Sequence, residues 1–172
     1  LVATGIEFLN SFHISRLNYI CRMRIVIQRV AQASVTIGQQ VKSSIQAGLL
    51  ILLGIGKEDT EEDANWLVNK VIGLRIFNDE QGIMNRSIMD IKGEILVVSQ
   101  FTLMASYKKG NRPSWIHAAP HELSIPLYDY FCKTLSEALG KPISTGEFGS
   151  DMKVKLLNDG PVTICMDTKN KE

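Results

Sequence analysis

One run of eight residues, Gly48-Leu49-Leu50-Ile51-Leu52-Leu53-Gly54-Ile55, constrains the fold more than any other segment of this chain. Every residue between the two glycines is apolar, so an extended segment here needs cover on both of its faces. A run this short, bracketed by glycines, also suits a strand better than a helix. We therefore predict a buried central strand with other elements packed on each side of it.

The flanking sequence predicts further strands. β-branched residues at 25–30 and 35–37, with Ala33-Ser34 between them, favour a pair of strands, and residues 94–99 favour another buried one. Asn158-Asp159-Gly160-Pro161 has the composition of a turn. The sequence accordingly predicts three short strands at the end of the chain, near residues 143–148, 152–156 and 162–166.

Two segments have the pattern of helices. The first begins after Asp59 or Thr60, either of which can cap it, and its apolar residues recur at helical spacing as far as Ile72. The second is predicted from about Pro126 to Leu139, with Gly140 ending it. Strands before, between and after two helices predict a single mixed α/β domain, layered β/β/α, with a mixed sheet or barrel-like β core.

Composition limits the classes of function. The net charge of +1 gives no overall basic field, so a nucleic-acid ligand would need a local basic patch or recognition of its end. No apolar run approaches the length of a membrane span. Cys21, Cys132 and Cys165 are scattered, which is typical of reduced thiols in a cytoplasmic protein. Residues 1–22 differ in pattern from the rest and are interpreted as an extension, with the folded domain covering 23–172.

Several common chemistries do not fit. Gly54-Ile55-Gly56-Lys57 lacks the first glycine of a phosphate-binding loop, and Glu58 stands where that loop has serine or threonine. His117 and His121 have no obvious third metal ligand and are interpreted as surface histidines, so no metal and no cofactor is predicted. Cys132 lies on the inward side of the second helix and is interpreted as a packing residue.

Two segments contain residues whose presence folding alone does not explain. Ser99-Gln100-Phe101-Thr102-Leu103, the first signature segment, places hydroxyl and amide groups at the end of a buried strand, where binding groups are common. The alternative is a polar strand end with Phe101 in the core. Asn158-Asp159-Gly160-Pro161-Val162-Thr163, the second signature segment, contains a Gly-Pro bond that would point two carbonyls in one direction if it were cis. The alternative there is a plain turn.

Together these two segments resemble the Ser-Gln-x-Thr and Asn-x-Gly-Pro-Val-Thr motifs of bacterial-type D-aminoacyl-tRNA deacylases. The resemblance extends over residues 23–168, including the stretches 23–30, 110–114 and 145–152. It implies a cytoplasmic hydrolase that cleaves the ester between a D-amino acid and the 3′-terminal adenosine of tRNA, and so proofreads translation. It also implies activity on glycyl-tRNA mischarged on tRNA-Ala.

The resemblance further implies a homodimer with two equivalent sites at the subunit interface. One subunit would supply the catalytic residues and the other a cis Gly160-Pro161, whose carbonyls hold the D-configured amino group. Arg29 would brace that dipeptide, and the remaining pocket residues would be Phe148, Gly149 and Met152. The catalytic residues implied are Ser99, Gln100, Phe101 and Thr102.

Two points stay open in the sequence. Thr102 could act as a nucleophile, although no partner base is visible for it, or the 2′-hydroxyl of the terminal ribose could help to activate water. The basic loop of Lys108, Lys109 and Arg112 could contact phosphates of the acceptor end, or it could be an ordinary solvated loop.

Overall fold

The computed structural model describes residues 23–108 and 110–171, so the predicted extension at residues 1–22 lies outside the described residues. Strand β3 (Gly48–Gly54) lies between β1 (Arg24–Ile37), to which it is antiparallel, and β6 (Glu94–Ser99), to which it is parallel. The short β7 (Ser144–Thr145) follows β6, and β2 (Gln40–Ile45) and β8 (Met152–Asp167) both pair with β1. The sheet is therefore mixed, as predicted.

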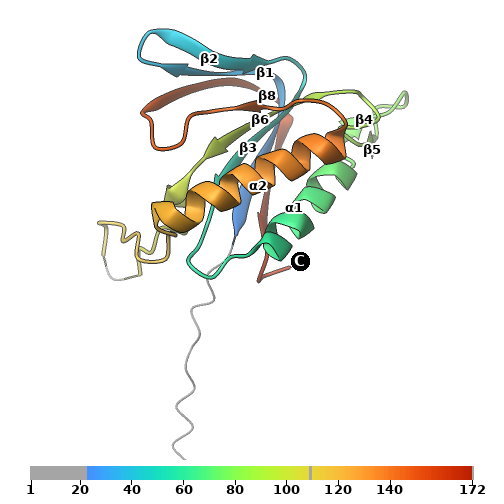
Figure 1. Ribbon diagram of the computed structural model, residues 1–172. Helices are drawn as coiled ribbons and strands as arrows, with labels where there is room; N and C mark the ends of the chain where they lie inside the picture. Colours follow the sequence, from blue (N-terminus) through green and yellow to red (C-terminus); the bar gives the residue numbers. More distant parts are fainter. Residues whose placement is uncertain (1–22, 109, 172) are drawn as a thin grey trace, which may run out of the picture.

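The central strand is buried on both faces, as its sequence predicts. Leu49, Ile51 and Leu53 lie in one core cluster with the helices, while Leu50 lies in a second cluster formed by strands alone. Helices α1 (Glu61–Gly73) and α2 (His121–Leu139) cover the first face, as Figure 1 shows. The second half of β1 and the first half of β8, together with β2, curl over the second face. This is the predicted β/β/α layering.

Helix α1 begins where the sequence indicates. Thr60 is its N-cap, and the carboxylate of Asp63 accepts a hydrogen bond from the Thr60 backbone N–H at 3.1 Å. Ala64, Leu67 and Val71 are buried against the sheet. After α1 the chain turns between β4 (Phe77–Asn78) and β5 (Met84–Arg86), which form a separate two-stranded sheet.

The predicted start of α2 at Pro126 is wrong, because the helix begins at His121 and continues through this proline. The Pro120 carbonyl organises the first turn by accepting hydrogen bonds from the Leu123 and Ser124 backbone N–H groups at 3.1 and 2.9 Å. The Ser124 hydroxyl donates to the same oxygen at 2.9 Å. The turn before Pro126 therefore has hydrogen bonds of its own and does not depend on an N–H at position 126.

Two predicted strand breaks are also wrong. β1 continues through Ala33-Ser34, because this stretch pairs with β2 on one side and with β8 on the other. β8 continues through the predicted turn at 158–161, because residues on both sides of it pair with the same strand, β1, instead of with each other. The chain keeps its direction, and the turn-like residues bulge out of the strand. No helix in the described part of the chain is long and apolar enough to cross a membrane.

Gly48 allows the close approach of β6 to β3. A Cβ atom at this position would overlap the backbone of Glu94, its partner on β6. We expect Gly48→Ala to lower the free energy of unfolding by about 3 kcal/mol, because the methyl group has to separate two paired strands in a filled core. Urea unfolding followed by circular dichroism measures this change.

Gly73→Ala is the matched control for this substitution. A Cβ at Gly73, the last residue of α1, meets no atom within 4 Å. We expect no loss of stability there, and at most a gain of about 1 kcal/mol from the higher helix propensity of alanine. Equal losses in the two variants would contradict the steric explanation for Gly48.

Candidate functional site

The first signature segment leaves the sheet at the end of β6 and turns sharply. The Gln100 backbone N–H donates to the Leu53 carbonyl at 2.7 Å, which anchors the segment to the end of β3. The short 3-10 helix η1 (Phe101–Met104) follows directly. A Cβ on Gly54 would lie 2.9 Å from the Leu103 Cβ and 3.0 Å from the Gln100 carbonyl oxygen. The glycine that ends the central strand thus lets η1 pack closely against it.

A cavity of about 450 Å³ opens at this end of β3 and β6. It brings together six of the residues implied by the resemblance: Ser99, Gln100, Phe101, Phe148, Gly149 and Met152. Its walls are completed by Ile55, Val98, Ala118, Ala119 and His121, among others. Segments about fifty residues apart in the sequence therefore form one pocket with apolar walls and a polar strand end, which is the usual make-up of a small-molecule site.

One interpretation of the sequence placed Phe101 in the core, but in the structure Phe101 is not a core residue. Its side chain is 57% exposed at the edge of the cavity, and its ring meets the Trp115 ring edge-on at 5.3 Å between centroids. Thr102, which follows it, is half-buried, and its hydroxyl oxygen accepts a hydrogen bond from the side-chain amide of Gln100. An amide nitrogen cannot take up a proton, so Gln100 cannot serve as a base for Thr102.

Phe148 forms one wall of the cavity and is held between two other rings. Tyr128 and His121 each contact it edge-on, with centroids 5.7 Å away. The Tyr128 hydroxyl donates to the Val97 carbonyl at 3.0 Å, which ties α2 to β6 beside the cavity. Interpreting His121 as a surface histidine was therefore incomplete: it is exposed, but it also lines the cavity. A single histidine next to a helix start has no spacing pattern that would have revealed this.

The second signature segment is a bulge in β8. Gln28 pairs with Thr163 and Val30 with Asn158, so the four residues 159–162 oppose the single residue Arg29. The Asn158 side chain closes the bulge by accepting from the Val162 N–H at 2.9 Å and donating to the Val162 carbonyl at 3.1 Å. The Gly160-Pro161 peptide bond is cis, as the resemblance implies. The bulge leaves both residues exposed.

Arg29 braces the bulge, as the resemblance also implies. Its side chain is almost fully buried, with a relative exposure of 7% for the residue. The guanidinium donates to the carbonyls of Asp159 at 2.9 Å and Ile76 at 2.5 Å, and it lies 3.2 Å from the Asp159 carboxylate. It therefore connects the bulge to the segment that follows α1.

The two signature segments do not meet within one chain. Arg29 and the bulge lie level with Leu49 on the central strand, whereas the cavity begins at Leu53. Four residues of extended strand separate these levels by about 13 Å. Arg29, Gly160 and Pro161 are accordingly not among the residues that line the cavity.

The predicted basic loop lies beside the cavity. Ser106 and Ser114 form an isolated bridge with two backbone hydrogen bonds of 2.8 Å each, and Lys108 and Arg112 are exposed between them. Lys109 lies outside the described residues. Neither Lys108 nor Arg112 lines the cavity.

Cys132 does not line the cavity. Burial raises the pKa of the Cys132 thiol to about 12, so the thiol stays neutral and acts as a packing group of α2. The described residues include no group of three or more histidine, cysteine and acidic side chains placed to hold a metal ion.

Burial also raises the pKa of Asp59 to about 6, although this carboxylate accepts a hydrogen bond from the Gly56 N–H at 2.6 Å. Asp59 stabilises the turn behind Ile55 and does not line the cavity.

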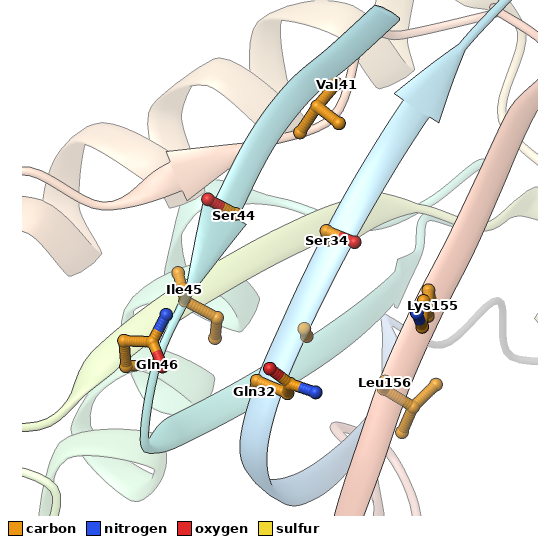
Figure 2. A pocket seen from close by; sticks show the side chains of 9 residues that line it. Gln32, Ser34, Val41, Ser44, Ile45, Gln46, Lys155 and Leu156 are labelled. Atoms are coloured by element: carbon orange, nitrogen blue, oxygen red, sulfur yellow. The ribbon is translucent and has the colours of Figure 1, made fainter. Parts of the chain in front are cut away.

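A second cavity, of about 300 Å³, lies on the layer formed by β1, β2 and β8. Figure 2 shows Gln32 and Ser34 on β1, Val41 and Ser44 on β2, and Lys155 and Leu156 on β8 around it. None of the residues implied by the resemblance lines this cavity. The candidate site is therefore the larger cavity at the end of β3 and β6.

The comparison with protein families agrees with the resemblance. Residues 26–167 match the family model described as D-Tyr-tRNA(Tyr) deacylase, and this range contains both signature segments and the cavity. The chain belongs to the D-Tyr-tRNA(Tyr) deacylase family. D-aminoacyl-tRNA deacylases of Bacteroides thetaiotaomicron and Phocaeicola vulgatus are 68% and 66% identical to it over 150 residues, which are 87% of this chain and all of each relative.

Solved structures share this deacylase fold. A structure titled c-Myc DNA Unwinding Element Binding Protein has a TM-score of 0.80 at 43% identity, covering 84% of this chain and 97% of that one. A probable eukaryotic D-amino acid tRNA deacylase has a TM-score of 0.74 at 18% identity, covering 85% and 99% of the two chains. The second likeness extends the fold to a sequence that has diverged widely from this family member.

Arg29 offers a test of how the bulge of this deacylase-family chain is held. Arg29→Met leaves the Asp159 and Ile76 carbonyls without their donor, so we expect a loss of about 3 kcal/mol in the free energy of unfolding. Arg75→Met is the matched control, because Arg75 also donates to a backbone carbonyl, that of Asn85 at 2.9 Å, but at an exposed position. We expect a change below about 0.5 kcal/mol there. Similar losses in both variants would contradict the bracing role.

Proposed function

We propose that this chain hydrolyses the ester bond of D-aminoacyl-tRNA, releasing a free D-amino acid and tRNA, and so proofreads chirality in translation. The observation that carries the proposal is the cavity that gathers Ser99, Gln100 and Phe101 with Phe148 and Met152, in a chain of the D-Tyr-tRNA(Tyr) deacylase family. In the reaction, water adds to the ester carbonyl, the bond to the ribose oxygen breaks, and that oxygen takes up a proton.

Backbone groups supply the catalytic assistance in this proposal. The Phe101 N–H lies in the first turn of η1, where N–H groups have no partner within the turn, and can face the oxyanion that forms on the ester carbonyl. The Gln100 N–H is already used by the Leu53 carbonyl, so Gln100 contributes through its side chain and its position. Thr102, held by Gln100, belongs to the site without serving as a nucleophile. The ribose 2′-hydroxyl of the substrate helps to activate water.

A homodimer completes each site. The distance between the two signature segments within one chain supports a site shared between two copies, in which the exposed Gly160-Pro161 bulge of one subunit enters the cavity of the other. The Gly160 and Pro161 carbonyls then accept hydrogen bonds from the substrate ammonium group, and the side chain of an L-amino acid collides with the bulge. Glycine has no side chain to exclude, so glycyl-tRNA mischarged on tRNA-Ala is a second substrate.

The remaining assignments follow from the same proposal. Phe148, Gly149 and Met152 bind the substrate, and Lys108, Lys109 and Arg112 contact phosphates of the acceptor end. The catalytic domain covers residues 23–172 and acts in the cytoplasm. A non-catalytic module that binds RNA ends is the alternative, and it is distinguished by binding charged tRNA without hydrolysing it.

The stereochemical test uses the two enantiomers of one substrate. We expect purified protein to release D-tyrosine from D-Tyr-tRNA and to leave L-Tyr-tRNA intact, because only the D-enantiomer directs its side chain away from the bulge. Release of labelled tyrosine measures both rates. Equal turnover of the two, or of neither, would refute the proposal. Thr102→Ala should keep measurable turnover, and the wild-type protein should give no covalent acyl adduct in intact-mass spectra. A threonine nucleophile would instead require loss of turnover in the variant and an acyl adduct in the wild type.

The shared site is tested by complementation between two inactive variants. We expect Phe101→Pro in the first signature segment and Gly160→Ala in the second to be inactive separately. Proline removes the N–H that faces the oxyanion, and a Cβ on Gly160 would lie 2.7 Å from the Val162 Cγ2 atom. Random mixing of the two subunits should restore about a quarter of wild-type activity, because half of the two-fold dimers would be mixed and each would keep one intact site. If each site were built within one subunit, mixing would restore nothing.

A further inference from the structure

Three aromatic side chains are exposed beside the cavity, one at the start of η1 and two in the segment between η1 and α2. Phe101, Tyr107 and Trp115 are 57%, 76% and 39% exposed, and Ile116, next to Trp115, is exposed as well. Large apolar side chains at neighbouring positions on a surface commonly mark a binding site. We call Phe101, Tyr107 and Trp115 the aromatic platform.

Backbone contacts hold the platform at the mouth of the cavity. Phe101 lines the cavity and contacts Trp115, and Ala118 and Ala119, three and four residues after Trp115, line it too. The Ser106–Ser114 bridge places Tyr107 and Trp115 on one short ribbon, and the Ala119 N–H donates to the Ile55 carbonyl at 2.9 Å. Figure 1 shows this segment, in yellow, projecting from the body of the fold at the start of α2. A ligand that extends out of the cavity on this side meets the platform.

The charge of the segment indicates the chemistry of the ligand. Residues 101–121 include Lys108, Lys109 and Arg112 and contain no aspartate or glutamate, although the whole chain has nearly equal numbers of basic and acidic residues. Lys108 and Arg112 are exposed. A surface that combines exposed rings with unopposed positive charge fits a single-stranded nucleic acid, whose bases stack on aromatic rings while its phosphates attract cations.

We propose that the aromatic platform stacks the unpaired nucleotides next to the 3′-terminal adenosine of the tRNA, while that adenosine enters the cavity. This inference rests on the proposed function and deepens it by stating how the RNA end is held. Stacking does not depend on base identity, so a platform of this kind serves an enzyme that must accept tRNAs of several amino acids. The other conceivable occupant is the same segment of a second copy of this chain. The unopposed positive charge disfavours that contact, because two identical basic segments repel each other.

The test compares a full substrate with one that lacks the stacked nucleotides. D-tyrosyl-tRNA and the 3′-O-D-tyrosyl ester of adenosine share the scissile bond, but only the tRNA reaches the platform. We expect Tyr107→Ala and Trp115→Leu to raise KM for D-tyrosyl-tRNA by at least about fivefold, the lower limit for losing one stacked base. Both variants should change kcat/KM for the adenosine ester less than about twofold, because the cavity stays intact.

Three comparisons separate stacking from a structural effect. Trp115→Phe keeps a ring and should retain most of the affinity for tRNA. Trp66→Leu is the matched control, because Trp66 lies on α1, where it packs against Lys70 and Lys171, and it does not line the cavity. Tyr107→Ala removes the most exposed ring of the platform, so it tests the proposal even if Trp115→Leu fails to fold.

The contrary outcomes are distinct. Equal losses on both substrates, or no loss on tRNA, would overturn the platform, and conversion of a dimer to monomer in the variants would assign this surface to contact between subunits. If wild-type protein cleaves neither substrate, the proposed function fails. The platform would then be decided by fluorescence anisotropy with an RNA hairpin that has a four-nucleotide 3′ overhang. Weaker binding by Tyr107→Ala than by wild type supports the platform, and equal binding overturns it.

Discussion

The burial of β3 on both faces is the constraint on which the rest of the structure depends. An apolar strand of this kind needs a layer on each side, and the chain supplies two helices for one face and a curled extension of its own sheet for the other. The glycines at the two ends of β3 let β6 approach at Gly48 and η1 at Gly54. The same strand thereby fixes both the layers and the place where the first signature segment leaves the sheet.

The position of the cavity follows from this arrangement. Parallel strands β3 and β6 end together, and the polar residues after β6 emerge beside the walls contributed by α2 and the segment before β8. The exposed Gly160-Pro161 bulge is held level with the other end of β3 by a buried arginine. This separation of the pocket from the braced bulge is the observation behind the proposal that two copies share each site.

The predictions that failed share a physical cause. The break in β1, the turn in β8 and the late start of α2 were each inferred from residues that locally favour turns or interrupt helices. In the structure, Ala33 and Ser34 are paired on both sides, residues on both sides of Gly160-Pro161 pair with β1, and the turn before Pro126 has bonds to Pro120. Local propensities amount to about 1 kcal/mol for most residues and about 3 kcal/mol for proline inside a helix, so the summed pairing and packing of a whole strand or helix can override them.

The sequence by itself determined the central strand, the start of α1, the β/β/α layering and the two signature segments, because apolar patterning, capping and motif spacing are properties of adjacent residues. The resemblance had implied that Phe148 and Met152 share a pocket with Ser99 and that Arg29 braces the bulge. Only the tertiary structure added His121 to the cavity, moved Phe101 from a possible core position to the surface, and separated the bulge from the cavity within one chain. These relations join residues far apart in the chain, and strand register and packing decide them. No local sequence pattern predicts strand register or the packing of distant residues.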